Sequence, residues 1–327
     1  MFHVLSFRKK AQSLLEALLS ITLGVILIGS SVGLIGISLK TFNTTKQHLQ
    51  ANSLMRQTTE IIQSLTRDNW HNIYDLTKGS NYKITASGNT WTISSGQETS
   101  TINNIPYKRY FQVSNVTRDG SGNIAVSGTD DPNTQKIIAY LEYGGNYISS
   151  STLSFYLTRS YNNQVFQQTD WSGGSGQTGP ISNPGNKFDT ADSNINYAST
   201  TGSIYMTTAT TTAASLTSSI LDTGVAGGAG FNSLLWQGSL GTGGAVKFQI
   251  AFSNSSSGPW TYYGCTNCDP ASCSTSNYYQ PNPNVSCRFP TTGTASPQNN
   301  RYIRYKVYLS TTGTTPQIND IIINWSP

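Results

Sequence analysis

Apolar residues run almost without interruption from Leu14 to Leu39, and three positive charges, Arg8, Lys9 and Lys10, stand directly before them. As a helix, this 26-residue run would be roughly 39 Å long at about 1.5 Å per residue. About 20 apolar residues suffice to cross a bilayer. The pattern therefore predicts a membrane-spanning helix whose basic flank keeps the N-terminus in the cytoplasm.

Residues 40–69 continue the helical pattern beyond the apolar run. Apolar side chains recur there near the 3.6-residue period of an α-helix, at Leu39, Phe42, Leu49, Ile61, Ile62 and Leu65. Because no proline lies between Met1 and Tyr82, we predict one helix over about residues 13–68, with its apolar stripe on a sheet. Glycines within the run either weaken this helix or allow close approach of another: Gly24, Gly29, Gly33 and Gly36.

Short segments rich in aromatic and β-branched residues follow the helix, separated by Gly, Asn and Ser turns. They predict strands at residues 82–85, 90–93, 107–113, 137–143 and 153–157. A helix followed by a run of antiparallel strands predicts an α+β domain over residues 40–170.

A second set of strands follows a segment of Gly, Ser, Pro and Asn, which we predict as a linker over residues 171–199. Trp171 is the exception in this segment, and we expect it to pin the linker to a domain. The second set covers residues 203–206, 219–224, 234–236, 246–252, 302–309 and 318–325. Alternation of apolar and polar residues in these segments predicts a β-sandwich or jelly roll over residues 200–327.

Glu16 is the one ionisable residue inside the apolar run. A charged side chain costs about 2.5–3.5 kcal/mol at the centre of a bilayer and less near the interface. No Lys, Arg or His lies between Ala11 and Lys40 to neutralise it. The partner of this carboxylate therefore has to come from elsewhere.

A basic leader, a small residue, and a Glu at the fifth place after it resemble the N-terminus of type IV prepilins and pseudopilins. The resemblance implies cleavage between Ala11 and Gln12 by a membrane peptidase, which methylates the new amine. It also implies that Glu16 meets the N-terminal amine of a neighbouring subunit in a filament. The family usually has Gly before the cut and often Phe after it, so Ala11 and Gln12 depart from its pattern.

Two simpler interpretations of the N-terminus remain open beside the resemblance. A secretory signal has an apolar core of about 7–15 residues, and this run is longer. A plain membrane anchor accounts for the length and the basic flank, but it leaves Glu16 without a role.

Composition and the placement of histidine exclude several classes of enzyme site. Only 11% of residues are charged, and Ser, Thr, Asn and Gly are abundant, which fits an extracellular β-rich protein. No histidine follows His71, so the rest of the chain has no Ser-His-Asp site and no His-ligated metal. From residue 200 on, the carboxylates are Asp222, Asp269 and Asp320, with no Glu, which disfavours a glycosidase.

All four cysteines lie in one polar segment, Cys265, Cys268, Cys273 and Cys287. Four thiolates could bind zinc, but outside the membrane thiols oxidise, so we expect two disulfides. Spacing does not settle the connectivity; we favour Cys265–Cys287 and Cys268–Cys273.

Aromatic residues near the cysteines are the candidate ligand contacts: Trp260, Tyr278 and Tyr279. Exposed aromatic rings stack on sugars or anchor protein partners. For Trp260 the preferred interpretation is that it fills the edge of the sandwich, and Tyr278 and Tyr279 are the better candidates for an exposed contact. Asp119, in the segment 119–123, and Asp222 are weak calcium candidates, and a hairpin turn is the preferred interpretation of 119–123. We expect no cofactor and no other metal.

The predicted organisation is a leader at 1–11, a transmembrane or filament-core helix at 12–39, a pilin-like helix and sheet at 40–170, a linker at 171–199 and a sandwich with a Cys-stapled loop at 200–327. The sequence order of the last strands also resembles jelly-roll modules of bacterial surface proteins, similar to galactose-binding-like domains. This second resemblance bears on the fold more than on a ligand.

The expected function is that of a non-enzymatic type IV pilus subunit, a minor or tip pilin that presents its sandwich for adhesion. Its implied partners are other pilin subunits, the prepilin peptidase, an inner-membrane assembly platform and a surface glycan or cell ligand, with no specific nucleic acid. We expect a single-pass membrane protein that moves into an extracellular filament. The alternatives are a pseudopilin of a type II-like secretion system and a membrane-anchored carbohydrate-binding surface protein.

Overall fold

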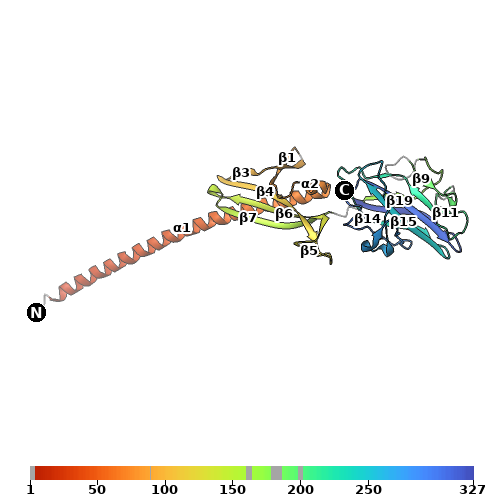
Figure 1. The fold of residues 1–327 in the computed structure, drawn as a ribbon. Coiled ribbons are helices and arrows are strands. Elements are labelled where there is room, and N and C mark those ends of the chain that lie inside the picture. Colours follow the sequence, from red (N-terminus) through yellow and green to blue (C-terminus); the bar gives the residue numbers. More distant parts are fainter. Residues whose placement is uncertain (1–3, 89, 160–163, 178–185, 198–201) are drawn as a thin grey trace. The chain divides into compact units, whose positions relative to one another are not determined.

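The computed structural model describes residues 4–88, 90–159, 164–177, 186–197 and 202–327, with side chains from residue 14 on. These residues form two compact units. One unit comprises Met1–Thr58, Thr99–Arg109 and Tyr140–Ser151, and the other comprises Thr59–Glu98, Tyr110–Ala139 and Thr152–Pro327. Figure 1 shows a long N-terminal helix and two sets of antiparallel strands, as the sequence predicts.

Helix α1 extends from Val4 to Asp68, and the short helix α2 from His71 to Tyr74. Every side chain of α1 from Leu14 to Lys46 is exposed or nearly so, and burial starts only at Ala51. The buried positions follow helical spacing: Ala51, Met55, Thr58, Ile61, Ile62 and Thr66. The predicted burial of the apolar stripe is therefore wrong at Leu39, Phe42 and Leu49, which are exposed. The helix extends beyond the strands, which cover only its C-terminal part.

The sheet beside the helix has the strand order β2-β1-β4-β6-β7, with β3 and β5 pairing onto β4. Its strands are β1 Tyr82–Ser87, β2 Thr90–Ser95, β3 Glu98–Ile102, β4 Ile105–Arg118, β5 Ile124–Ala125, β6 Thr129–Tyr143 and β7 Ser149–Thr158, with a 3₁₀ turn at Gly145–Tyr147. In the first unit, the Tyr143 hydroxyl lies 2.7 Å from His48 Nδ1, and Arg109 donates to Gln57 at 3.1 Å. These contacts join β6 and β4 to the helix and give the predicted α+β arrangement.

Two further sheets face each other across one hydrophobic core and form the β-sandwich. One has the order β10-β11-β20-β14-β18 with β8 on β20, and the other β13-β19-β12-β9 with β15 on β19. The strands are β8 Gln164–Gln168, β9 Phe188–Ala191, β10 Ile195–Asn196, β11 Ile204–Met206, β12 Ala214–Ser218, β13 Leu221–Asp222, β14 Gly230–Ser239, β15 Gly244–Ser253, β18 Cys287–Arg288, β19 Tyr302–Thr311 and β20 Gln317–Ser326.

The alternating segments of the sequence place their apolar members in this core. In β19, Ile303, Tyr305, Val307 and Leu309 are buried, and the residues between them are half-buried on the outer face. Trp236 of β14 is fully buried, and its indole N–H donates to the Pro281 carbonyl at 2.8 Å. A period of two with one apolar face therefore describes these strands correctly.

The predicted linker is wrong in part. Strands β9 and β10 lie inside 171–199, and β8, expected in the preceding domain, pairs with β20 of the sandwich. Trp171 is fully buried in the sandwich core, and its indole N–H donates to the Tyr305 hydroxyl at 3.1 Å. Strands β8 and β9 have no clear hydrophobic pattern in the sequence, because each buries few side chains. Backbone hydrogen bonds to a longer neighbouring strand hold each of them in its sheet. Part of the linker, 178–185 and 198–199, lies outside the described residues.

The disulfide pairing also differs from the favoured one: Cys265 bonds Cys273, and Cys268 bonds Cys287. Strands β16 (Gly264–Cys265) and β17 (Cys273–Ser274) pair antiparallel and set Cys265 directly opposite Cys273. Short 3₁₀ turns at Thr266–Cys268 and Pro270–Ser272 then leave Cys268 to reach Cys287 of β18, with the Cα atoms 5.4 Å apart. The local hairpin, which spacing did not reveal, decides the connectivity.

Asp320 of β20 is a buried carboxylate whose titration should affect stability. One oxygen accepts a 2.7 Å hydrogen bond from Gln167, the other has no partner, and burial raises the pKa of Asp320. A raised folded-state pKa means that the folded protein binds the proton more tightly than the unfolded chain does. The contribution of Asp320 to the free energy of unfolding therefore falls as the pH rises from the ordinary Asp range through the raised pKa.

We therefore expect Asp320→Asn to raise the free energy of unfolding at pH 7, with the gain shrinking toward pH 4. Urea unfolding of the full chain in detergent, followed by circular dichroism across this range, measures the effect. Asp119→Asn is the matched control. The pKa of the exposed Asp119 is lowered by hydrogen bonds led by the backbone N–H of Asn123, so its replacement should lose stability at pH 7. If the stability of both variants responded equally to pH, the raised pKa assigned to Asp320 would be contradicted.

Candidate functional site

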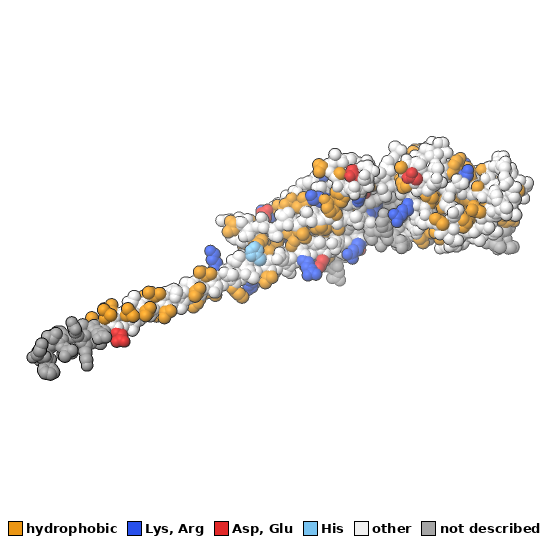
Figure 2. Space-filling view, turned by 90° about the horizontal axis from the view of Figure 1, so that it is seen from below, with side chains coloured by type: hydrophobic (Ala, Val, Ile, Leu, Met, Phe, Trp, Pro, Cys, Tyr) orange, Lys and Arg blue, Asp and Glu red, His pale blue; other side chains and the backbone are white. Residues whose placement is uncertain are grey.

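The first candidate site is the apolar helix segment, residues 14–39 of α1. It contains the window that qualifies as a membrane span, with a mean hydropathy of 2.3 and no buried residue. Figure 2 shows hydrophobic side chains gathered along this helix. Together with two disulfides in the sandwich, this segment suits a membrane anchor that carries an extracellular part.

Glu16 is exposed near the start of the apolar helix segment. The next basic residue along the helix, Lys40, lies about 36 Å away at 1.5 Å per residue, so it cannot neutralise the carboxylate. The predicted cleavage residues Ala11 and Gln12 and the leader residues Arg8, Lys9 and Lys10 have side chains outside the described residues. Their roles, like that of Glu16, stay predictions.

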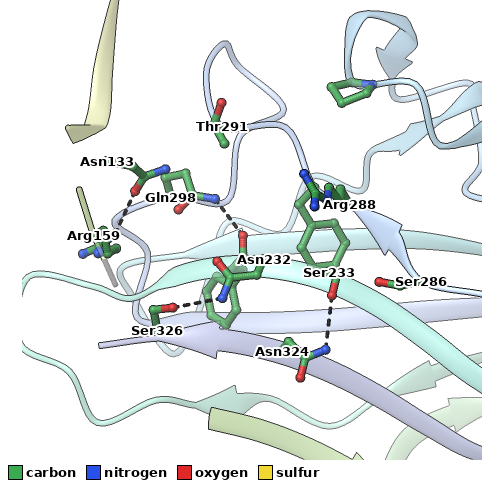
Figure 3. A pocket seen from close by; sticks show the side chains of 13 residues that line it. Asn133, Arg159, Asn232, Ser233, Ser286, Arg288, Thr291, Gln298, Asn324 and Ser326 are labelled. Carbon is green, nitrogen blue, oxygen red and sulfur yellow. Dashed lines mark hydrogen bonds between the residues drawn. The ribbon is translucent and has the colours of Figure 1, made fainter. Parts of the chain in front are cut away.

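The second candidate site is a cavity of about 430 Å³ against β14, β18 and β20, which we name the polar pocket. Figure 3 shows the side chains that converge on it. Its lining is Asn133, Arg159, Phe231, Asn232, Ser233, Pro270, Ser286, Arg288, Phe289, Thr291, Gln298, Asn324 and Ser326. Most of these side chains are polar, and none carries a carboxylate.

A β-bulge in β14 shapes the floor of the polar pocket. Phe231 pairs with Trp325 and Ser233 with Asn324, which leaves Asn232 as an extra residue on β14. A bulge interrupts the alternation of side chains and re-aims them, which lets the neighbours Asn232 and Ser233 both line the cavity. Ser233 also pairs across the ladder with Arg288 of β18, which places an exposed guanidinium at the same edge.

Three side-chain amides in the polar pocket use their nitrogens for structure. Asn232 donates to the Ser326 hydroxyl at 2.9 Å, Asn324 to the Ser233 hydroxyl at 3.2 Å, and Gln298 to the Phe231 carbonyl at 2.7 Å (Figure 3). Among the described residues, no donor reaches the oxygens of these amides. The pocket therefore offers three hydrogen-bond acceptors, the amide oxygens, whose orientation is fixed by the hydrogen bonds of the amide nitrogens.

Arg159, directly after β7, supplies a buried cation to the polar pocket. It is 5% exposed and donates to Asn299 Oδ1 at 3.0 Å and to the Gly228 carbonyl at 3.3 Å. Its Nε is buried without a partner, and no carboxylate in the described part of the chain pairs with its guanidinium. Burial lowers the pKa of Arg159 to about 10, so it remains charged at neutral pH.

The aromatic residues singled out from the sequence do not line the polar pocket. Tyr279 is 1% exposed, so the expectation that it contacts a ligand is wrong: its backbone pairs with Phe248 and its ring is buried in the core. Tyr278 and Trp260 are half-buried. Each ring already makes a cation–π contact within the protein. Lys247 lies 5.5 Å from the ring centroid of Tyr278, and Arg304 lies 5.4 Å from that of Trp260.

Both weak calcium candidates have protein partners in the structure. Asp119 accepts backbone hydrogen bonds from Ser121 and Asn123, which makes 119–123 the hairpin turn between β4 and β5. Asp222 accepts hydrogen bonds from both Nε and Nη2 of Arg301, at 2.8 and 2.9 Å, and this contact lowers the pKa of Asp222. Within the described ranges, no three His, Cys, Asp or Glu residues gather as metal ligands would.

Sequence reasoning missed the polar pocket entirely. Its side chains come from β6, β14, β18 and β20, from the residue after β7 and from the loops on either side of β18, and most are common polar residues without a motif. Only the bulge and the strand pairing bring them together.

No known protein family matches this chain, and no curated protein matches it. One similar solved structure concerns the promiscuous specificity of carbohydrate-binding modules from the β-sandwich superfamily. It is 10% identical with a TM-score of 0.26, over 77% of this chain and 100% of that one. A second, from the Gt strain of infectious bursal disease virus, is 8% identical with a TM-score of 0.19, over 74% and 62% of the two chains. At such scores, function has to be argued from the residues of this chain.

Proposed function

We propose that this chain is a type IV pilin-like filament subunit that presents its β-sandwich for adhesion. The observation that carries the proposal is Glu16, a lone carboxylate in an exposed apolar helix that continues without a break to Asp68. An anchor alone needs no carboxylate there, and its charge makes insertion less favourable. A filament supplies a use for it, because the N-terminal amine of a neighbouring subunit can neutralise it.

The exposed helix supports the same proposal. Large apolar side chains from Leu14 to Leu49 are more than half exposed, so they require a bilayer or other helices around them. A bilayer suits the chain before assembly, and a bundle of like helices suits it afterwards. Before assembly, the N-terminus lies in the cytoplasm and the sandwich outside.

The sandwich supports placement as a minor or tip subunit. It is large beside the helix and its sheet, and such bulk suits a few positions in a filament better than every position. A pseudopilin of a type II-like secretion system shares the N-terminal pattern, but a large extra sandwich favours a surface role. In the second alternative, an anchored carbohydrate-binding protein, the helix stays in the membrane.

Processing by a prepilin peptidase tests the proposal. The full chain is expressed with and without the peptidase, and its intact mass and N-terminal sequence are determined. We expect a methylated Gln12 at the N-terminus only when the peptidase is present. Ala11→Ile, which replaces the small residue before the cut, should block the change. A chain that still begins at Met1, in cells whose peptidase processes another prepilin, would leave a plain membrane anchor.

A further inference from the structure

We infer that the polar pocket binds an acidic saccharide, a sugar unit that bears a carboxylate. The inference rests on the part of the proposed function that assigns binding to the sandwich, and it is independent of filament assembly. It also differs from the sequence expectation, because neither Trp260 nor Tyr278 takes part.

The charge of the polar pocket favours an anion. Arg159 and Arg288 line it, and no lining residue is acidic. Buried arginines are normally paired, because burying an unpaired charge is costly. Arg159 instead donates to the neutral oxygens of Asn299 and Gly228, lies 3.2 Å from His71 Nε2 and retains a buried Nε–H without a partner. Asp75 acts on this guanidinium only through the electrostatic field, so a ligand carboxylate would supply a direct ionic partner.

The second guanidinium is available at the opposite side of the cavity in Figure 3. Arg288 is exposed on β18, and no hydrogen bond or ion pair ties it to the described residues. A guanidinium binds a carboxylate through two parallel N–H bonds in a fixed geometry, which gives direction as well as charge. Arg288 can thus contact the ligand without disrupting the fold.

The remaining polar groups favour a ligand rich in hydroxyls. The amide oxygens of Asn232, Gln298 and Asn324 are acceptors, and Ser286 and Thr291 add hydroxyls at the rim. A sugar hydroxyl donates to one group while it accepts from another, so it can join an amide oxygen to a guanidinium N–H. The volume lies within the range of roughly 300–1,000 Å³ that small-molecule sites occupy.

A peptide C-terminus, which also carries a carboxylate, fits the polar pocket less well. Extended peptides bind largely through main-chain hydrogen bonds along a strand edge. The donors and acceptors of the pocket are side chains spread over several strands, and the rim strand β18 is only two residues long.

The test is calorimetric titration of the full chain in detergent with tetragalacturonate and with the same oligosaccharide after reduction of its carboxyl groups. We expect the acidic form to bind about tenfold more tightly or better. Arg288→Gln should remove about that factor for the acidic form and little for the neutral one. Lys247→Gln is the matched control, because it removes the same charge from the other sheet, and it should change the affinity by less than about twofold.

Several results would overturn the inference: equal affinity for both forms, no binding of either, displacement by a short peptide with a free C-terminus, or an equal loss in Lys247→Gln and Arg288→Gln. Circular dichroism of both variants verifies that they fold. Because the titration uses the unassembled chain, its failure leaves the filament proposal standing. Failure of peptidase processing likewise leaves the pocket standing.

Discussion

Glu16→Ala is expected to abolish incorporation of this chain into filaments while leaving its insertion into the membrane intact. Alanine removes the only charge from the apolar helix segment, so insertion becomes more favourable. Assembly loses the carboxylate that would neutralise a neighbouring amine. Leaving one partner of a buried charge pair alone costs about 2–5 kcal/mol, which corresponds to about 30-fold or more in affinity.

The measurement is the fraction of the chain in sheared filaments compared with the membrane, by immunoblot. Processing between Ala11 and Gln12 should continue in the variant, since the cleaved bond is unchanged. Asp119→Ala, which removes an exposed carboxylate from the β4–β5 turn, is the control and should assemble normally. Normal incorporation of Glu16→Ala would remove the main support for the filament proposal and favour a permanent anchor.

Trp236→Ala is expected to lower the free energy of unfolding of the sandwich by about 3–5 kcal/mol, the usual range for deleting a buried Trp or Phe side chain. Trp236 is fully buried in the core between the two sheets. Its loss also leaves the buried Pro281 carbonyl without the indole N–H that lies 2.8 Å away. Against a typical domain stability of about 5–15 kcal/mol, such a loss is severe.

Hydrogen exchange of the amides in β14 and β20 of the full chain in detergent measures this loss, because their ladder opens only when the sandwich does. Trp236→Phe should retain most of the stability, since it keeps an aromatic ring and loses mainly the hydrogen bond. Trp91→Ala, at a position 38% exposed on β2, should change the exchange of these strands little. A small effect of Trp236→Ala would mean that the core tolerates or refills the space.

The two candidate sites place separate demands on the chain. The apolar helix segment requires neighbours, either lipid or like helices, whereas the polar pocket is complete within a single chain. A variant in one site should therefore leave the other unaffected, and filament assembly and ligand binding can be measured independently.

The long helix and most strands follow from the sequence alone, because their patterns are local. An unbroken apolar run without proline specifies a helix whatever surrounds it, and alternation in β15 and β19 specifies strands with one buried face. Glu16 could be found in the same way, since a single charge among apolar residues is visible without a fold. The hairpin at Asp119–Asn123 is another local feature, and the structure confirms it.

Only the tertiary structure decided what depends on residues distant in sequence. Strands β8, β9 and β10 have too few apolar residues to be recognised, and neighbouring strands hold them in place through backbone hydrogen bonds. The disulfide pairing depends on the β16–β17 hairpin, and the burial of Tyr279 on its pairing with Phe248. The polar pocket depends on a bulge and on strands far apart in the chain, so no pattern of neighbouring residues could have revealed it.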